Sequence, residues 1–192
     1  MDDYRVRRTV FETESSFRLD DVVLVRGLGG AEVQRIALAE VRKVALSYQP
    51  LTVSDRWVCS VEGGGGRIWI PSASFTGVGQ AADQRASFRP FVQALCAAVT
   101  AQPSGPNVVY VKGSNWSAYG ALAMLIVMAI LGLLLALGVL GALLDGGGLG
   151  GASWAFLPIA VTLWASRMVW RVWRRNRRHA FDPKALPPDF AA

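Results

Sequence analysis

The sequence contains very little histidine and cysteine, the residues that supply most protein metal sites and many nucleophiles. His179 is the single histidine in 192 residues, and the two cysteines, Cys59 and Cys96, form no Cys-x-x-Cys pair. Structural zinc sites need several such ligands at close spacing, and a Ser-His-Asp triad needs a histidine beside its serine. We therefore expect two buried thiols, no metal, no cofactor and no enzymatic activity.

Glycine clusters are present, but the residues that would make them phosphate-binding loops are missing. Gly63 to Gly66 is not followed by the Gly-Lys-Ser/Thr of a P-loop. Gly27-Leu28-Gly29-Gly30 lacks the third glycine of a dinucleotide-binding fingerprint. Both clusters therefore predict turns between strands.

Charged side chains are absent from two long apolar runs, 118–144 and 152–166. A helix rises about 1.5 Å per residue and needs roughly 20 apolar residues to cross a hydrocarbon core about 30 Å thick. The runs thus predict transmembrane helices at 116–144 and 152–173, joined by a glycine-rich periplasmic loop at 145–151. Without ionisable groups in the middle of these runs, we do not expect ion transport.

The excess of basic residues lies beside this predicted hairpin. The net charge is +6 and the pI is about 9.9, yet residues 1–115 carry 13 basic and 11 acidic side chains. Basic residues mark the cytoplasmic flank of a membrane span. We therefore expect a multi-pass protein of the bacterial inner membrane with both termini in the cytoplasm. The start, Met1 to Arg5, predicts no signal peptide, and we expect no nucleic-acid partner.

The segment 1–102 has the pattern of one small domain. Alternating apolar residues predict short strands within 6–14, 17–26, 33–38, 44–48, 56–62, 67–71 and 72–75. Apolar residues at helical spacing predict one amphipathic helix that buries Phe88, Phe91, Val92, Leu95, Cys96 and Val99. We expect a linker at 103–115; an extra edge strand at 108–112 is the alternative.

Three stretches give this domain a family resemblance. They are Arg35-Ile36-Ala37-Leu38-Ala39-Glu40-Val41, Arg67-Ile68-Trp69-Ile70-Pro71 and Phe88-Arg89-Pro90-Phe91-Val92-Gln93-Ala94-Leu95. Their order resembles that in small bacterial membrane proteins with a pleckstrin-homology-like (PH-like) domain. The resemblance implies an α+β fold, in which a PH-like antiparallel β-sandwich or barrel of about seven strands is capped by one C-terminal helix and precedes the transmembrane hairpin.

Basic and aromatic residues gather at the predicted cytoplasmic interface. The arginines recur at helical spacing in one stripe, and tryptophans typical of an interfacial belt accompany them. The residues expected to contact the membrane surface are Arg167, Arg171, Arg174, Arg175, Arg178, Trp116, Trp170 and Trp173. These residues either recognise anionic lipid headgroups or only set the topology.

Small residues four positions apart permit close helix approach in the first apolar run. The two pairs are Gly132/Ala136 and Gly138/Ala142. They indicate either packing against the second helix or the seam of a homodimer.

We interpret the chain as a membrane-anchored, non-enzymatic binding or scaffolding protein that presents a PH-like domain at the cytoplasmic face. Its expected partners are the lipid bilayer and an unidentified membrane protein or a second copy. One alternative is a sensor of anionic lipid headgroups that uses Arg42, Lys43 and Arg56. A second is a subunit of a membrane enzyme or transport complex. The basic, proline-rich cytoplasmic tail comprises 174–192, and its segment 181–190 is expected to be disordered, with docking as the alternative.

Overall fold

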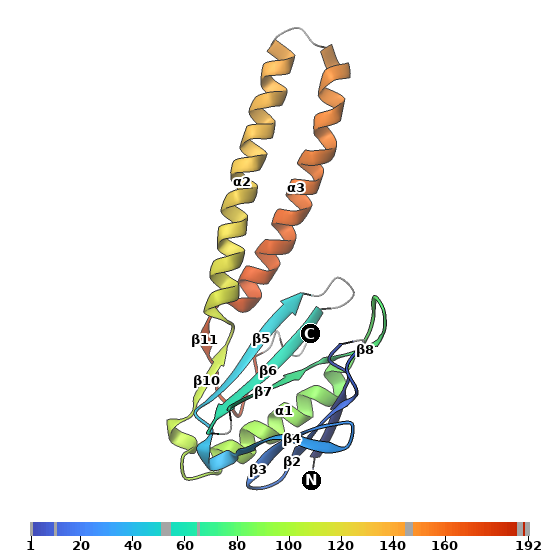
Figure 1. The fold of residues 1–192 in the computed structure, drawn as a ribbon. Helices are drawn as coiled ribbons and strands as arrows, with labels where there is room; N and C mark the ends of the chain where they lie inside the picture. The colour runs from blue at the N-terminus through green and yellow to red at the C-terminus, as the bar shows by residue number, and fades with distance from the viewer. Residues whose placement is uncertain are drawn as a thin grey trace. The chain divides into compact units, whose positions relative to one another are not determined.

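The computed structural model describes residues 2–9, 11–50, 55–64, 66–144, 148–187 and 190 (Figure 1). The chain forms two compact units. Unit 1 comprises Met1–Gly113 together with Arg178–Ala192, and unit 2 is Ser114–Arg177. The chain therefore leaves unit 1, forms unit 2 and then returns to unit 1, so unit 2 is an insertion.

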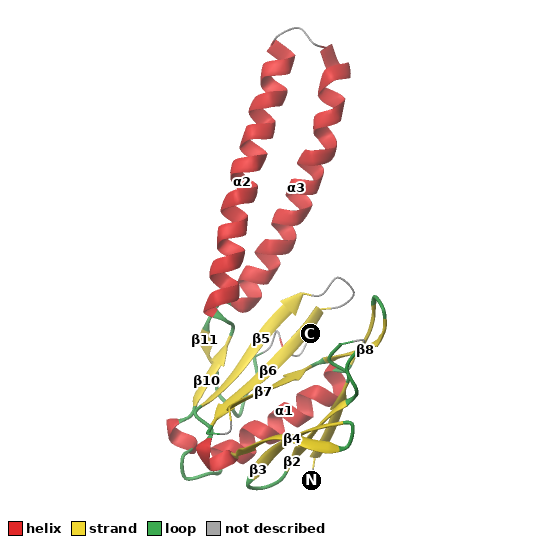
Figure 2. Cartoon of the chain, viewed as in Figure 1, coloured by secondary structure: helices red, strands yellow, loops and turns green. Residues whose placement is uncertain are grey.

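A four-stranded antiparallel sheet opens unit 1, in the order β1-β2-β3-β4 (Figure 2). Phe17 and Leu19 point into the core, while Arg18 between them is exposed, as the alternation of a half-buried strand requires. The turn between β3 and β4 uses Gly29 and Gly30, whose φ angles of 59° and 90° favour glycine. The four strands are β1 Asp2–Val6, β2 Ser15–Leu19, β3 Val23–Leu28 and β4 Ala31–Ala37.

A second sheet has the order β11-β10-β5-β6-β7. Its strands are β5 Lys43–Pro50, β6 Asp55–Gly63, β7 Gly66–Pro71, β10 Val109–Lys112 and β11 His179–Ala180. β10 runs parallel to β5, whereas the other neighbours are antiparallel. The segment expected as a linker thus contains a strand, as its alternative proposed. The remaining short elements are η1 Leu38–Glu40, β8 Ala73–Gly77, β9 Gln80–Asp83 and η2 Gly105–Asn107.

Helix α1, Arg85–Thr100, packs on the core of unit 1 with its apolar stripe. The side chains predicted to be buried are all buried: Phe88, Phe91, Val92, Leu95, Cys96 and Val99. Tyr4 of β1 lies against the rings of Phe88 and Phe91, with centroids 5.8 and 5.6 Å away, and donates its hydroxyl proton to the Pro71 carbonyl at 2.7 Å. Tyr4 therefore joins the first sheet, α1 and the end of β7.

The described part of the C-terminal tail belongs to this core, which corrects the expectation of a disordered tail. β11 pairs with β10, and Phe181 packs edge-on against Tyr110 at 5.8 Å. Phe190 is 3% exposed and lies 5.6 Å from the Trp57 ring and 5.4 Å from the Phe88 ring. Burial of these aromatic rings stabilises the segment against the core, although its sequence is polar and rich in proline.

Unit 2 is a hairpin of α2, Asn115–Leu144, and α3, Gly148–Asn176, which pack against each other. Among the described residues, no helix is both long and apolar enough to cross a membrane. This corrects the predicted transmembrane hairpin and the multi-pass location in the inner membrane. An uncharged run makes a helix a candidate for a span but does not by itself establish one. Of the predicted periplasmic loop, 145–147 lies outside the described residues, and α3 begins at Gly148.

The observed fold is a mixed α/β arrangement, which also corrects the predicted fold class. The described residues form three α-helices and three sheets instead of a single seven-stranded sandwich with one helix and a membrane hairpin. Two features account for the difference: β10 pairs in parallel with β5, and the tail returns to add β11. Neither pairing follows from alternation along the chain, because alternation defines a face and not a partner strand.

Candidate binding sites

The first candidate site is a small pocket on the outer face of the second sheet. It has a volume of about 110 Å³ and is lined by Arg8, Thr9, Gln49, Arg56, Val58, Trp69 and Pro71. Strand register explains this composition, since Gln49 pairs with Arg56 and Val58 pairs with Pro71. Paired residues lie on the same face of a sheet, so these side chains are neighbours on the side opposite to the buried Trp57. We call this site the arginine pocket.

The arginine pocket belongs to a cluster of three arginines. Arg56 donates from Nε and Nη2 to the Gln49 Oε1 atom, at 3.0 and 2.8 Å. Arg26 Nη2 lies 3.1 Å from Glu12 Oε1, and Arg8 Nη1 lies 3.9 Å from the same oxygen. Arg8 and Arg26 thus share one carboxylate, while Arg56 is held by a neutral amide.

The pKa values of Arg56 and Arg26 are lowered first by burial and then by neighbouring positive charge. Burial lowers the pKa of Arg56, and the nearby Arg8 lowers it further. Burial and Arg8 also lower the pKa of Arg26, while Glu12 acts in the opposite direction. The Arg26 Nε atom is buried and has no hydrogen-bond partner. The cluster is therefore a place where an anion would be stabilised.

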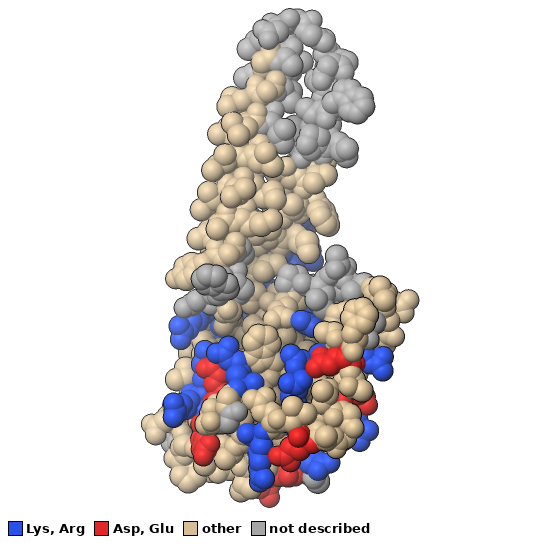
Figure 3. Space-filling model, viewed as in Figure 1, with Lys and Arg blue, Asp and Glu red and all other residues tan. Residues whose placement is uncertain are grey.

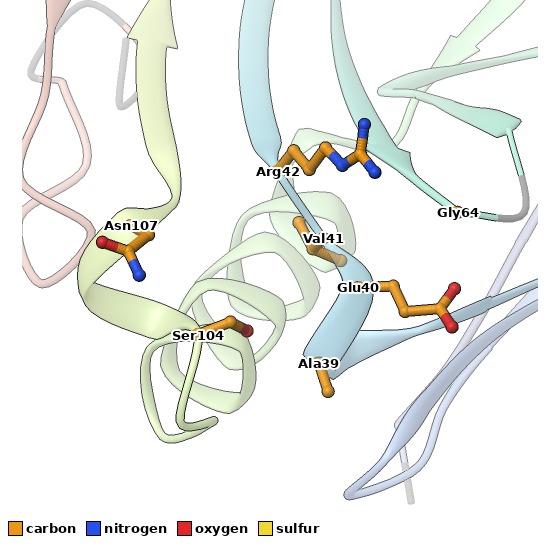
Figure 4. A pocket seen from close by; sticks show the side chains of 7 residues that line it. All are labelled: Ala39, Glu40, Val41, Arg42, Gly64, Ser104 and Asn107. Carbon is orange, nitrogen blue, oxygen red and sulfur yellow. The ribbon is translucent and has the colours of Figure 1, made fainter.

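A larger open pocket of about 580 Å³ lies where η1 approaches the segment after α1 (Figure 4). Its lining residues are Ala39, Glu40, Val41, Arg42, Gly64, Ser104 and Asn107. Figure 4 shows the Glu40 and Arg42 head groups pointing away from Ser104 and Asn107. A small-molecule site usually brings a few polar groups together at one point. This pocket does not, so it supports no ligand.

The three basic residues predicted to sense lipid headgroups are not gathered at one place. Arg42 lines the larger pocket, and Arg56 lines the arginine pocket. Lys43 lies 3.8 Å from Glu62 in an ion pair. Of the predicted set, only Arg56 belongs to the arginine cluster. Sequence reasoning did not predict Arg8 and Trp69 as neighbours of Arg56. The apolar Val58 on an otherwise polar strand face was a signal that this face forms part of a site.

The second candidate site is the surface of unit 2. Figure 3 shows basic and acidic side chains interspersed on the visible face of unit 1, whereas α2 contains no charged residue. The described side chains of the hairpin leave many large apolar groups exposed: Tyr119, Leu122, Met124, Ile126, Val127, Ile130, Leu131, Leu133, Leu134, Leu137, Val161, Leu163, Trp164, Met168 and Trp170. A concentration of exposed large apolar side chains of this kind indicates an interaction site.

The glycines predicted for helix packing divide into two kinds. A methyl group at Gly132 would lie 3.7 Å from Thr162 Cγ2, so Gly132 faces α3 within the hairpin. At Gly138, and at Gly141, which was not among the predicted residues, an added methyl group would have no neighbour within 4 Å among the described residues. The side chains of Ala136 and Ala142 lie outside those described. Gly132 thus fits packing within the hairpin, while Gly138 faces open space.

Six of the eight residues predicted to contact a membrane surface lie in the last three turns of α3. Arg167, Arg171 and Arg174 are exposed, and Arg175 is half-buried. α3 ends at Asn176, so Arg178 is not on the helical stripe and belongs to unit 1. Trp170 stacks on Trp173 at 4.7 Å, and Arg177 lies over the Trp173 ring at 5.1 Å. The side chain of Trp116 lies outside those described.

Both thiols are buried, as predicted. Cys59 and Cys96 are unpaired cysteines in the core of unit 1. Burial raises the pKa of Cys96 to about 12 and raises that of Cys59 well above its ordinary value. Among the described residues there is no group of three or more side chains of the kind that hold metals.

Comparisons with known protein families, with curated proteins and with solved structures found no match. The resemblance to bacterial PH-like proteins therefore stays a prediction, and the candidate sites above are assigned on geometry alone.

Proposed function

We propose that the protein is a non-enzymatic binding protein that associates with a second copy of itself through the hairpin of unit 2. The observation that carries this proposal is the concentration of exposed large apolar side chains on α2 and α3. A helix that is apolar on all sides is normally buried, and large exposed apolar patches are uncommon on monomeric proteins. A second hairpin of the same composition would cover this surface.

The size of the surface suits a stable dimer. α2 has 30 residues, which corresponds to a helix about 45 Å long and about 10 Å wide. The face formed by two such helices therefore offers about 900 Å² in projection, against the roughly 800 Å² that each partner buries in a typical specific interface. Two hairpins packed in this way would form a four-helix bundle.

Backbone access and charge favour one arrangement of that bundle. Gly138 and Gly141 face open space, so a partner helix can approach α2 closely there. Arg167, Arg171 and Arg174 are exposed near the end of α3. A parallel pair of hairpins would bring these arginines together, whereas an antiparallel pair separates like charges. We therefore infer antiparallel packing.

The oligomeric state of the full chain tests the proposal. Sedimentation velocity over a range of concentrations should show a dimer for the wild type. Ile130→Glu and Leu134→Glu place charges on the exposed apolar surface of α2 and should give a monomer. Val78→Glu introduces the same charge at a site of unit 1 that is 84% exposed, and it should remain dimeric.

Two results would contradict the proposal. The first is a wild-type chain that stays monomeric at every concentration. The second is a chain that is recovered only with lipid or detergent bound to a single copy, because the apolar surface would then be covered by lipid and not by a second hairpin.

A further inference from the structure

We infer that the arginine pocket binds a phosphate group, with Arg8 and Arg56 contacting the phosphate oxygens and Trp69 contacting the group that carries the phosphate. This inference is independent of the proposed dimer, because every residue involved lies in unit 1. It rests on the charge balance, the fixed position of Arg56 and the size of the pocket.

The charge balance leaves two positive charges to be matched. Among the contacts described for the cluster, Glu12 is the carboxylate that Arg8 and Arg26 share, and Arg56 is bound to the neutral Gln49. Two of the three guanidinium groups thus share one carboxylate, and the third is bonded to an uncharged side chain. A phosphate monoester carries a charge of about −1.5 to −2 at pH 7, whereas a carboxylate carries one negative charge. The excess matches a phosphate better than a carboxylate.

Gln49 holds the Arg56 guanidinium in position before any ligand arrives. The two hydrogen bonds from Arg56 to Gln49 Oε1 use the Nε and Nη2 atoms, and neither engages Nη1. An arginine that is already oriented loses less conformational entropy on binding. The fork-shaped guanidinium is also the group that suits phosphate oxygens. The side chain is only partly exposed, so water screens its charge less than it would screen a fully exposed one.

The pocket has room for a phosphate group. Its volume of about 110 Å³ is several times the roughly 10 to 15 Å³ that one water molecule needs on the same scale. Trp69 lines the pocket and is 44% exposed, so the indole offers an apolar surface to whatever the phosphate is attached to. The ligand class is therefore a phosphate monoester, which is either a soluble compound or a lipid headgroup.

Titration calorimetry with the full chain tests the inference, using phenyl phosphate as the probe and benzoate as the singly charged control. The wild type should bind phenyl phosphate saturably and benzoate at least tenfold more weakly. Gln49→Glu should lower the affinity for phenyl phosphate roughly tenfold or more, because the new carboxylate competes for Arg56 and removes one unit of excess charge. Arg56→Gln and Arg8→Gln should have similar effects.

Matched controls separate these effects from general loss of charge or of folding. Arg89→Gln removes one positive charge from an exposed position of α1 and should bind phenyl phosphate like the wild type. Gln49→Glu keeps the shape of the side chain and adds an ion pair to Arg56, so this variant should fold even if an arginine variant does not.

Vesicle sedimentation distinguishes the two sources of the phosphate. Phosphatidylcholine vesicles containing phosphatidic acid should be bound by the wild type and not by Gln49→Glu if the source is a lipid headgroup. Saturable binding of phenyl phosphate alone assigns a soluble source. The inference is overturned if the wild type binds neither probe, if benzoate binds as tightly as phenyl phosphate, or if Gln49→Glu leaves both affinities unchanged.

Discussion

Replacing Phe190 with alanine tests whether the C-terminal segment is a structural part of unit 1. The Phe190 ring is 3% exposed and packs against Trp57 of β6 and Phe88 of α1. The chain reaches this position only after passing through the whole of unit 2. If these contacts hold unit 1 together, removing the ring must destabilise a core that begins at the other end of the sequence.

The expected magnitude follows from burial. Truncating a buried phenylalanine to alanine typically costs about 3 to 5 kcal/mol. Relaxation of the surrounding side chains can fill part of the cavity and lower this cost. We therefore expect the free energy of unfolding of unit 1 to fall by about 2 to 4 kcal/mol, which includes the roughly 0.5 to 1.5 kcal/mol of an aromatic pair.

Thiol labelling in urea measures this loss for unit 1 specifically. Both cysteines are buried in unit 1, so a thiol reagent reports its opening and is not affected by unfolding of unit 2. With a urea dependence of about 2 kcal/mol per molar, Phe190→Ala should lower the labelling midpoint by roughly 1 to 2 M. Phe11→Ala is the matched control, because Phe11 is 97% exposed.

The reasoning is refuted if Phe190→Ala and Phe11→Ala have labelling midpoints that agree within the error of the measurement. Such a result would mean that the ring contacts of Phe190 contribute nothing to the stability of unit 1. The core would then be complete without the returning segment.

Three further predictions concern unit 1 and the hairpin. Gly105→Ala should lower the free energy of unfolding by about 1 to 3 kcal/mol in the same labelling assay. The new methyl group would lie 2.9 Å from the backbone carbonyl carbon of Thr100, so the backbone must shift. Gly138→Ala, where the methyl group meets open space, should not lower the helix content measured by circular dichroism, since alanine is the better helix former. The free energy of unfolding should fall as the pH rises above about 9, because burial raises the pKa of Cys96 from 9.0 to about 12. Between these values the unfolded chain has lost its thiol proton while the folded chain retains it. Urea midpoints measured at pH 7 and pH 10 check the sign of this change.

The local elements of unit 1 were predictable from the sequence. The stripe from Phe88 to Val99 repeats at helical spacing, and the structure buries all of it on α1. Trp57, Cys59 and Val61 occupy one face of a strand whose other face is polar except at Val58, and all three are buried on β6. Both patterns are local, because the period of a helix or strand is set by backbone geometry within a few residues.

The arginine pocket was only partly predictable. Arg56 was expected to contact an anionic ligand, but with Arg42 and Lys43 as its companions. The structure places it beside Arg8 and Trp69 instead, through the pairing of β5, β6 and β7 and the path of the chain after β1. A sequence reveals which residues share a strand face, whereas the neighbours on adjacent strands depend on register.

Unit 2 shows how far composition can mislead. The uncharged run predicted a membrane span, yet the described residues contain no helix that meets the requirement for one. The same apolar character is present in the structure as exposed side chains on α2 and α3. Composition identified an apolar hairpin, but not what covers it.

The sequence by itself determined the helical hairpin, the face that α1 buries and the burial of both cysteines, because each depends on the order of apolar and polar residues within one element. Only the tertiary structure decided that β10 lies parallel to β5, that Phe190 packs against Trp57 in the core, and that Arg8 and Arg56 line the same pocket. These contacts join residues far apart in the chain. Their partners are selected by packing and strand register, for which no local pattern exists.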